Sequence, residues 1–281
     1  MNASPAPLPV TPPASRPPPS SAPIPEATSR AELLLGADAM QRLATARILV
    51  AGVGGVGAAV AETLVRSGCR NLHLADFDLL RASNLNRHPF ATASTLDRPK
   101  LEAARDRLLD IAPDLNLVLH PVFINAETAA PLLAQAAPEL LVDAIDSLNP
   151  KTELLLAAET AGIPHILSCL GAARKLDPMA FRIALLDHTH TCPLARLLRK
   201  RLRHRIAHNH VLAVFSVELP QPLSPGAPPP SDDDFLAGRG RLRSPMGSYA
   251  PCTLAEATLA AATAIRLLSS TPPAPTSEPT A

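Results

Sequence analysis

Residues 47–57 read RILVAGVGGVG, and this stretch decides the fold. Its first five residues form a short apolar run typical of a buried strand, and the segment 58–67 that follows has the periodicity of an amphipathic helix. Glycine permits a tight turn, lets the backbone approach phosphate oxygens and lets the helix pack closely on the strand. The stretch therefore predicts a phosphate-binding turn at a helix N-terminus, whose free N–H groups attract anions.

Strand-like apolar runs and helical segments alternate along the chain as far as residue 169. The further strands are expected at 72–75, 117–122, 140–144 and 165–169, and the further helices at 99–111 and 151–161. Such alternation is typical of an α/β fold of the Rossmann-like, doubly wound kind, with a mostly parallel sheet and helices on both faces. Ligands of these folds bind at the carboxyl ends of the strands.

Proline divides the chain into a folded part and extended parts. Of 32 prolines, ten lie between Pro5 and Pro25, among Ser, Ala and Thr. Such segments bury too little apolar surface to order themselves. We therefore expect a disordered Pro-rich tail at 1–29, a nucleotide-binding domain at 30–220, a Pro/Asp-rich loop or insertion at 221–242, a return to the same domain at 243–270 and a second disordered tail at 271–281.

Composition excludes several classes of protein. Aromatic residues make up only 2% of the 281 residues and the net charge is +1, which argues against single-strand nucleic-acid platforms and polycations. The four cysteines show no CxxC pair, so neither a disulfide scaffold nor a four-cysteine zinc site is expected. Because no long uncharged apolar run and no signal-peptide pattern occurs, the expectation is a cytoplasmic protein with no membrane span.

Charged and polar residues follow the second predicted strand. Asp76 lies 19 residues past Gly57, where a carboxylate binds ribose in dinucleotide-binding folds. Arg87 and Lys100 suit a triphosphate better than a pyrophosphate, because a triphosphate carries more negative charge. A lone carboxylate at a strand end, Asp146, suits Mg²⁺. These residues favour ATP with Mg²⁺ over NAD, although each alone is also consistent with a solvated surface charge.

The combined pattern GxGGxG, DFD, SNLxR, Lys and DAxDS resembles the ubiquitin-activating-enzyme-like adenylating superfamily, which includes the activators of bacterial sulfur carriers. The resemblance implies that ATP and Mg²⁺ are bound, that a carboxylate is adenylated, and that the protein is a homodimer. It assigns catalysis to Arg87, Lys100 and Asp146, nucleotide binding to Gly52, Gly54, Gly55, Gly57, Asp76, Asp78, Asn84, Arg87, Lys100 and Ser147, and the metal to Asp146.

Four further segments resemble one branch of that superfamily, the tRNA threonylcarbamoyladenosine dehydratases. They are Asp143–Ser147 with Lys151 following, Gly171–Pro178, Pro193–Arg196 and Phe215–Glu218. The resemblance implies ATP-dependent dehydration, by cyclisation, of N6-threonylcarbamoyladenosine in tRNA through adenylation of its carboxylate. The expected partner is a tRNA that carries this modified base.

The chain departs from the pattern at two positions, and other functions stay open. Leu33 stands where relatives commonly have Arg, and Ala213 where the branch commonly has Cys. One alternative is adenylation of a ubiquitin-like sulfur-carrier protein, with a sulfur-transfer or carrier protein as partner, although the paired CxxC of those enzymes is absent. Others are a non-catalytic nucleotide-binding adaptor and an NAD-dependent oxidoreductase. Attack at the α-phosphate rather than the γ-phosphate rests on the resemblance alone.

A basic segment stands out against the near-zero net charge. Six of the ten residues from Arg196 to Arg205 are Arg or Lys. We expect Arg199, Lys200 and Arg203 to contact tRNA phosphates. The alternative is a solvated helix whose three leucines, Leu197, Leu198 and Leu202, all pack inward.

The cysteines and a nearby histidine pair give weaker signals. Cys69 and Cys169 have apolar neighbours and are expected to be core thiols, whereas Cys252 lies in a segment that looks flexible and receives no role. His188, His190 and Cys192 alternate, but without a fourth ligand they favour a loop over a metal site.

Overall fold

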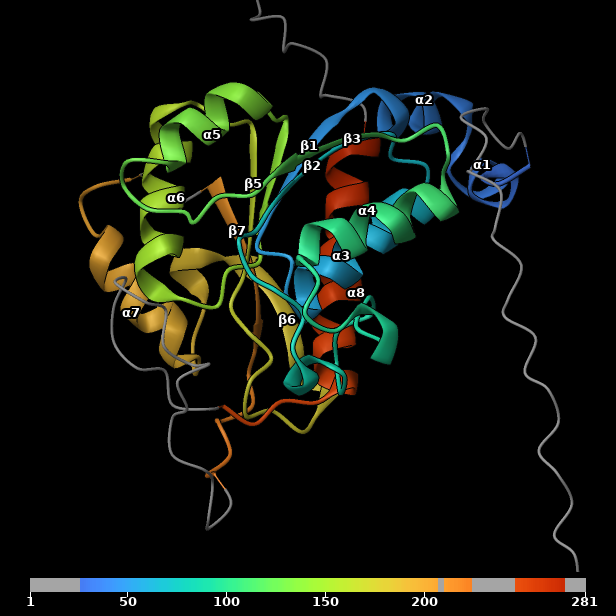
Figure 1. The fold of residues 1–281 in the computed structure, drawn as a ribbon. Helices are drawn as coiled ribbons and strands as arrows, with labels where there is room; N and C mark the ends of the chain where they lie inside the picture. Colours follow the sequence, from blue (N-terminus) through green and yellow to red (C-terminus); the bar gives the residue numbers. More distant parts are fainter. Residues whose placement is uncertain (1–25, 207–209, 224–245, 271–281) are drawn as a thin grey trace, which may run out of the picture.

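The computed structural model describes residues 26–206, 210–223 and 246–270 (Figure 1). The predicted disordered tails and the predicted loop or insertion at 221–242 fall mostly outside the described residues, at 1–25, 271–281 and 224–242. The described chain begins with two helices, α1 (Ser29–Leu35) and α2 (Ala37–Thr45), before the first strand.

A seven-stranded sheet forms the centre of the molecule, in the order β3-β2-β1-β4-β5-β7-β6. All neighbouring strands are parallel except β6 and β7, which are antiparallel. The strands are β1 (Arg47–Ala51), β2 (Asn71–Ala75), β3 (Asn116–His120), β4 (Leu140–Asp143), β5 (His165–Cys169), β6 (Phe181–Leu185) and β7 (Val211–Ser216). The strand order reverses between β1 and β4, so the expected ligand site lies at their carboxyl ends.

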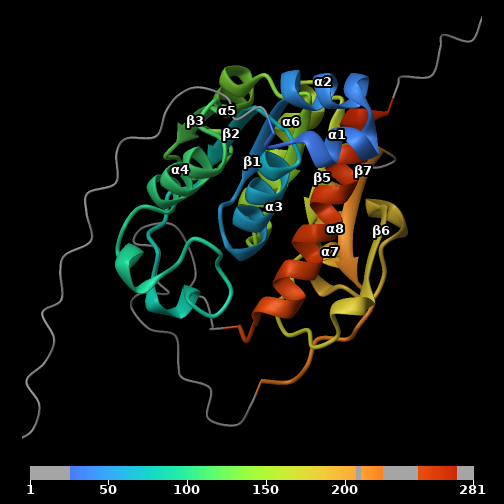
Figure 2. The same ribbon diagram turned by 90° about the vertical axis from the view of Figure 1, so that its right-hand side faces the viewer.

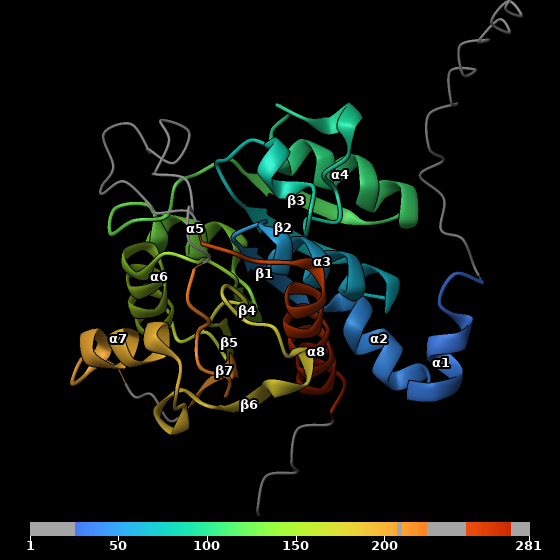
Figure 3. The same ribbon diagram turned by 90° about the horizontal axis from the view of Figure 1, so that it is seen from below.

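Helices cover both faces of the sheet, as the sequence predicts. On one side lie α3 (Gly55–Arg66), α4 (Lys100–Ile111) and α8 (Ala250–Ser269), and on the other α5 (Ala129–Ala136), α6 (Leu148–Thr160) and α7 (Pro193–Leu202) (Figure 3). Short 3₁₀ turns occur at Ala82–Asn84, Ala93–Thr95, Pro178–Ala180 and Leu186–His188.

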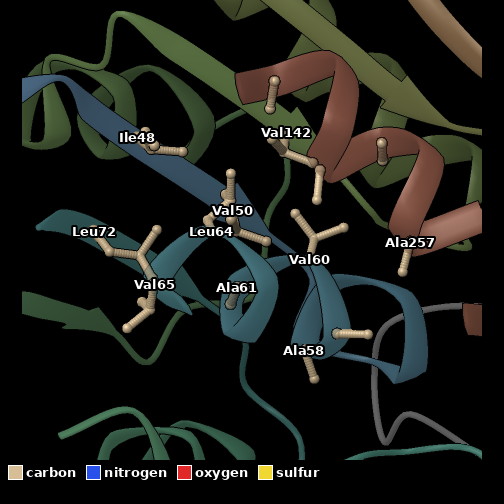
Figure 4. Packing of buried hydrophobic residues seen from close by; sticks show 14 of the residues in the cluster. Ile48, Val50, Ala58, Val60, Ala61, Leu64, Val65, Leu72, Val142 and Ala257 are labelled. Atoms are coloured by element: carbon tan, nitrogen blue, oxygen red, sulfur yellow. The ribbon is translucent and has the colours of Figure 1, made fainter. Parts of the chain in front are cut away.

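Strand β1 shows why two helical layers are needed. Its residues from Ile48 to Ala51 are fully buried and alternate between the two layers, because successive side chains of a strand point to opposite faces. Ile48 and Val50 pack with α3 residues such as Val60 and Leu64 (Figure 4), whereas Leu49 and Ala51 join the cluster on the α5–α7 side. The apolar run at 47–51 therefore reflects a strand with no solvent-facing side.

Helix α8 corrects one expectation from the sequence. Cys252 was expected in a flexible segment, but it lies in the first turn of α8 and is fully buried. The alanine-rich α8 lies beside α3 (Figure 2) and also contacts β4 and β5. Among the described residues, α8 is the one helix long and apolar enough to cross a membrane by length and composition. Its apolar side chains belong to the main core cluster, which accounts for that composition.

The basic segment forms α7, as expected, with one difference. Leu198 and Leu202 are fully buried, but Leu197 is 43% exposed, so only two of the three leucines face inward. Cys69 and Cys169 are buried core thiols, as predicted, and burial raises the pKa of Cys69 to about 12. His188 ends a 3₁₀ turn, and the segment that follows to Cys192 is a loop, also as predicted.

Candidate functional site: a polyphosphate-binding edge of the sheet

The turn between β1 and α3 has a shape that only glycine permits at two positions. Gly52 has a φ of 86°, in the left-handed region, and a Cβ there would lie 2.9 Å from the carbonyl oxygen of Ala144. A Cβ on Gly57 would lie 1.9 Å from the carbonyl oxygen of Gly52, so the first turn of α3 packs directly on the turn. The glycines thus hold β1, β4 and α3 in close contact.

The other two glycines, Gly54 and Gly55, stand at the start of α3 and have different surroundings. A Cβ on Gly54 would meet no atom within 4 Å, whereas one on Gly55 would lie 2.8 Å from the Thr253 methyl group at the start of α8. Among the described residues, no side chain caps the N-terminus of α3. Its first N–H groups are therefore available to an anion, as in phosphate-binding turns of related architecture.

Asp76 orders this turn. It is 8% exposed at the end of β2, and its carboxylate accepts hydrogen bonds from the backbone N–H of Val53 (2.6 Å) and of Asp78 (2.8 Å). Its two oxygens therefore tie the glycine turn to the loop after β2. A ribose hydroxyl would add to these contacts, since each carboxylate oxygen accepts more than one hydrogen bond.

Lys100, the first residue of α4, is the cation next to Asp76. Its Nζ donates to Asp78 Oδ2 at 2.9 Å and lies 3.9 Å from Asp76 Oδ1. The side chain is 10% exposed, so the two carboxylates compensate the cost of burying the ammonium group. A phosphate oxygen bound at Lys100 can replace part of the compensation that the two carboxylates provide.

Arg87 flanks the glycine turn from the loop after β2. Its Cγ would lie 3.3 Å from a Cβ on Gly55, and its Nη1 donates to Ser83 O (2.8 Å) and Asn86 Oδ1 (2.9 Å). Burial lowers the pKa of the Arg87 guanidinium, and the nearby Asp146 carboxylate opposes that shift. The negative charge of Asp146 therefore stabilises the charged form of Arg87.

The two asparagines of the SNLNR segment have different roles. Asn84 Oδ1 accepts the N–H of Arg81 at 3.0 Å and so closes the local turn. Asn86, which the sequence analysis did not select, orients Arg87 and also donates to Ser248 O at 2.7 Å, just before α8. The residue pattern alone does not distinguish the two amides, because the role of Asn86 depends on Ser248, which is distant in sequence and close to Asn86 only in the folded protein.

His88 is a second residue that sequence reasoning missed. Its Nε2 lies 2.9 Å from Val53 O and its Nδ1 accepts the N–H of Phe90 at 3.1 Å, which fixes a neutral ring that donates from Nε2. Burial, helped by the charges of Lys100 and Arg87, lowers the pKa of His88 to about 4. His88 therefore supports the glycine turn as a neutral hydrogen-bond donor; its position directly after Arg87 was the available signal.

Asp146 lies on the loop between β4 and α6, next to Ser147, whose Oγ donates to it at 3.5 Å. Among the described residues there is no group of three or more His, Cys, Asp or Glu that could hold a metal by itself. Mg²⁺ bound with nucleotides commonly uses one or two protein carboxylates and takes its other ligands from phosphates and water. The exposed Asp146 carboxylate fits that kind of site.

A buried ion pair fixes the loop that carries Asp146. Lys151, on α6, is fully buried, and its Nζ donates to Asp143 Oδ2 (2.5 Å), Ser168 Oγ (3.1 Å) and Cys169 O (2.9 Å). Lys151 thus joins the carboxyl ends of β4 and β5 to the start of α6. The sequence analysis placed Lys151 only in a family pattern, since its burial depends on the packing of all three elements.

The three residues predicted to contact tRNA lie away from the glycine turn, Arg199 and Lys200 in the last turn of α7 and Arg203 directly after it. Arg199 is half-buried and donates to Thr189 Oγ1, whereas Lys200 and Arg203 are exposed. Arg199 and Arg203, with Asp187 and His204, line a cavity of about 320 Å³. Arg201 donates to Asn149 Oδ1 on α6, so α7 lies beside the helix that begins after Asp146.

The residues predicted to bind the nucleotide thus lie together at the carboxyl ends of β1, β2 and β4, whereas the predicted tRNA contacts lie at the end of α7. The fold and the site together define a doubly wound α/β protein that presents two cations and an uncapped helix N-terminus at the carboxyl edge of its sheet, an arrangement suited to a polyphosphate.

The chain belongs to the ThiF family, which it matches over residues 28–280. It is 34% identical over 206 residues to tRNA threonylcarbamoyladenosine dehydratase 2 of Saccharomyces cerevisiae, covering 73% of this chain and 46% of the yeast protein. It is 35% identical over 192 residues to the tRNA threonylcarbamoyladenosine dehydratase of Bacillus subtilis, covering 68% of this chain and 75% of that protein. The chain thus spans about half the length of the yeast relative.

The structure is also similar to that of Escherichia coli tRNA N6-threonylcarbamoyladenosine dehydratase, TcdA, in complex with ATP. The TM-score is 0.74 and the sequence identity 26%, and the match covers 86% of this chain and 93% of TcdA. The predicted doubly wound fold with a mostly parallel sheet is thereby confirmed, and the sheet has seven strands where the sequence predicted five.

Proposed function

We propose that this protein uses ATP to dehydrate N6-threonylcarbamoyladenosine in tRNA by adenylating its carboxylate. One observation carries the proposal: Arg87, Lys100 and Asp146 converge on an uncapped glycine turn at the β1/β4 switch point. The names of the yeast, Bacillus and Escherichia relatives, and the ATP bound to the last of them, support the same activity.

The first step joins the substrate carboxylate to AMP. A carboxylate oxygen attacks the α-phosphorus of ATP, the bond to the bridging oxygen breaks, and pyrophosphate leaves. Negative charge grows on the phosphates in this step, and the α3 N–H groups, Arg87 and Lys100 stabilise it from fixed positions. Asp78, which holds Lys100 at 2.9 Å, keeps the ammonium group in place until a phosphate replaces part of that contact.

The second step closes a ring within the activated base. A nitrogen of the carbamoyl group attacks the acyl carbon of the mixed anhydride, loses its proton and expels AMP, which keeps the former carboxylate oxygen. The net change in the base is loss of one water. Because the carbamoyl nitrogen and the activated carboxyl group belong to the same modified nucleoside, proximity makes the closure fast, and no protein nucleophile is required. The substitution of Ala213 for the Cys of relatives is compatible with this route.

Mg²⁺ would be held by Asp146, with Ser147 beside it, and would neutralise phosphate charge when bound. The chain's own contribution is to fix that carboxylate, which the Lys151 contacts to β4 and β5 achieve. We include in the proposal a homodimer, in which residues near Leu33 would approach the partner's nucleotide. Leu33 is 86% exposed, which is compatible with such a contact.

The basic face of α7 is the proposed tRNA contact. Lys200 and Arg203 are exposed and suit phosphate contacts, whereas Arg199 reaches a phosphate only on leaving Thr189. Helix α7 lies near the carboxyl ends of β4 and β5, because Cys192 Sγ at its start donates to Leu170 O at 3.7 Å and Arg201 near its end donates to Asn149 Oδ1 at the start of α6. Transfer-RNA bound there would lie beside the nucleotide site.

The decisive test incubates the protein with ATP, Mg²⁺ and tRNA that carries threonylcarbamoyladenosine, followed by mass analysis of the nucleosides. The modified nucleoside should lose the mass of one water. Arg87→Ala and Asp146→Ala should each reduce the rate by about 10²–10³-fold, as when a charge-stabilising group is removed from an active site. Arg81→Ala is the matched control, because Arg81 lies in the same loop but pairs with Asp97 at 2.8 Å.

Two results would contradict the proposal. Full activity of Arg87→Ala would remove Arg87 from the phosphate site. ATP turnover that requires a ubiquitin-like carrier protein, and ignores modified tRNA, would establish sulfur-carrier adenylation in its place.

A further inference from the structure

Arg174 occupies an unusual position on the loop between β5 and the 3₁₀ turn Pro178–Ala180. Its φ is 61°, in the left-handed region that side-chain-bearing residues rarely adopt. Three hydrogen bonds hold it there: its N–H donates to Gly247 O (2.7 Å), its C=O accepts the N–H of Gln221 (2.8 Å), and its Nε donates to Gln221 O (2.5 Å). The surrounding structure therefore over-determines the position of Arg174.

The loop is fixed on its other side by Glu218, which follows β7. The Glu218 carboxylate accepts the N–H groups of Leu176 (2.9 Å) and Asp177 (3.0 Å), and Lys175 Nζ donates to Glu218 O. The loop after β5 and the chain after β7 thus form one rigid wall at the carboxyl edge of the sheet.

This wall is hydrogen-bonded to the nucleotide site. Gly247 O accepts from Arg174, and the adjacent Ser248 O accepts from Asn86 at 2.7 Å. Asn86 in turn accepts from the guanidinium of Arg87 at 2.9 Å. A short path of hydrogen bonds, through the adjacent residues Gly247 and Ser248, therefore runs from the proposed phosphate-binding arginine to the backbone of Arg174.

The two Nη groups of the Arg174 guanidinium have no acceptor among the described residues. Within the part of the chain that the structure describes, Nε alone has an acceptor, and no carboxylate lies within the 4.0 Å of an ion pair. Its segment is also basic, since residues 165–220 hold nine Arg or Lys against three Asp or Glu. With Nε anchored, the two Nη groups form a planar, oriented pair of donors, which matches a carboxylate.

The geometry points to Arg174 as the residue that binds the carboxylate of the modified base before adenylation, an assignment that rests on the proposed function. Two anions, the carboxylate and the polyphosphate, must approach one another at this edge, and an anchored guanidinium offsets their repulsion. The tRNA phosphates have the exposed cations of α7, whereas half-buried Arg174 sits on the wall connected to Arg87. Arg174 is thus a specificity-determining residue, which separates threonylcarbamoyl-bearing tRNA from unmodified tRNA.

Arg174→Gly is the test variant, because glycine accepts a φ of 61° and the change removes the side chain, with its Nε contact to Gln221 O, without straining the backbone. Arg174→Lys keeps the charge without the planar pair. Arg182→Gln is the matched control, an exposed β6 arginine that donates to the carbonyls of Met179 and Phe181. For each protein we would measure the Kd of ATP, the Kd of tRNA with and without the threonylcarbamoyl group, and kcat and KM of dehydration.

Arg174→Gly should raise KM for modified tRNA about 10- to 100-fold, the value of a charge-assisted hydrogen bond, and abolish the preference for modified over unmodified tRNA. Arg174→Lys should fall between it and the wild type, and the Kd of ATP should not change. An unchanged KM would overturn the assignment, and so would an equal weakening of both tRNAs, which would make Arg174 a phosphate contact. If the wild type binds modified tRNA through Arg174 but never dehydrates it, the proposed function fails and the site stands. If it neither dehydrates nor prefers modified tRNA, both fail.

Discussion

Two halves of the sheet use their charges in opposite ways: the half of strands β1 to β4, called here the first side, and the half of strands β5 to β7, called here the second side. From Arg47 to Lys151, nine of the ten basic residues lie within ion-pair distance of a carboxylate, and the tenth, Arg87, interacts with Asp146. From Arg174 to Arg205, none of the nine basic residues has a carboxylate that close among the described residues. Paired charges hold a structure together, whereas unpaired ones are available to an anionic partner. This contrast is consistent with the proposed nucleotide site on the first side and with the proposed tRNA contact on the second.

The largest effect should come from breaking the most deeply buried pair of the first side. Lys151→Met leaves the Asp143 carboxylate fully buried without its cation, and we expect the free energy of unfolding to fall by about 3–5 kcal/mol in urea denaturation. The double variant Asp143→Leu/Lys151→Met, which buries no charge, should recover much of that loss. A single variant as stable as the wild type would show that the pair does not hold β4, β5 and α6 together.

A smaller effect should come from Glu256, a buried acid of α8 that contacts the loop after β5. Glu256 is fully buried, Oε1 accepts the N–H of Gly171 at 2.8 Å, and burial raises its pKa to about 7. The folded protein therefore binds a proton that the unfolded chain releases above its ordinary pKa of 4.5, so stability is lost as pH rises from 4.5 through 7. Glu256→Gln should abolish this loss, on the order of 2–3 kcal/mol, when urea denaturation is compared at pH 5.5 and pH 8.

His88 should change the pH dependence of stability in the opposite direction from Glu256. Its pKa is lowered to about 4, so the unfolded chain binds the extra proton and stability is lost as pH falls from 6.5 through 4. His88→Gln should flatten the acid limb and leave the change above neutrality intact. The same pH profile for both variants would mean that neither group is responsible for it.

Charge reversal on α7 tests the unpaired side directly. Lys200→Glu/Arg203→Glu should weaken tRNA binding by about tenfold or more and flatten the dependence of log K on log salt by about 2, as expected for two lost phosphate contacts. Arg105→Glu/Arg107→Glu on α4 makes the same change in net charge among paired residues and is the control. Equal losses in both variants would show that overall charge, not the α7 face, drives binding.

The smallest effect should come from an exposed pair of the first side. Arg81 and Asp97 are 49% and 75% exposed, and such pairs contribute about 0.5 kcal/mol or less. Arg81→Ala should therefore change thermal unfolding and activity only marginally. A large loss would mean that pairing on this side does more than shape the loop after β2.

Sequence reasoning succeeded where local pattern determines structure. The run from Arg47 to Gly57 specifies strand, turn and helix through apolar content and glycine, and the strand alternation up to Cys169 predicts the parallel sheet. The antiparallel edge strand β6 and the buried α8 were not predicted, because both are positioned by contacts with segments that are distant in sequence. A short apolar run such as Phe181–Leu185 has no feature that fixes its direction in a sheet.

The site was predictable in its residue types but not in its contacts. Asp76 was expected to bind ribose, and that role stays a prediction, but its two oxygens already fix Val53 and Asp78. Asn86, His88 and Lys151 were missed because their roles arise from burial and from hydrogen bonds to segments far along the chain. No local pattern encodes such tertiary contacts.

The position of α8 has a consequence for biosynthesis. Helix α3, completed by residue 66, keeps one apolar face uncovered until residues 250–269 emerge from the ribosome and pack against it. Contacts between segments so distant in sequence form slowly, and the exposed alanine- and valine-rich face meanwhile favours aggregation of the nascent chain. Folding of this domain should therefore finish only after residue 269 has been synthesised, and its yield should depend on chaperones that shield α3 in the interval.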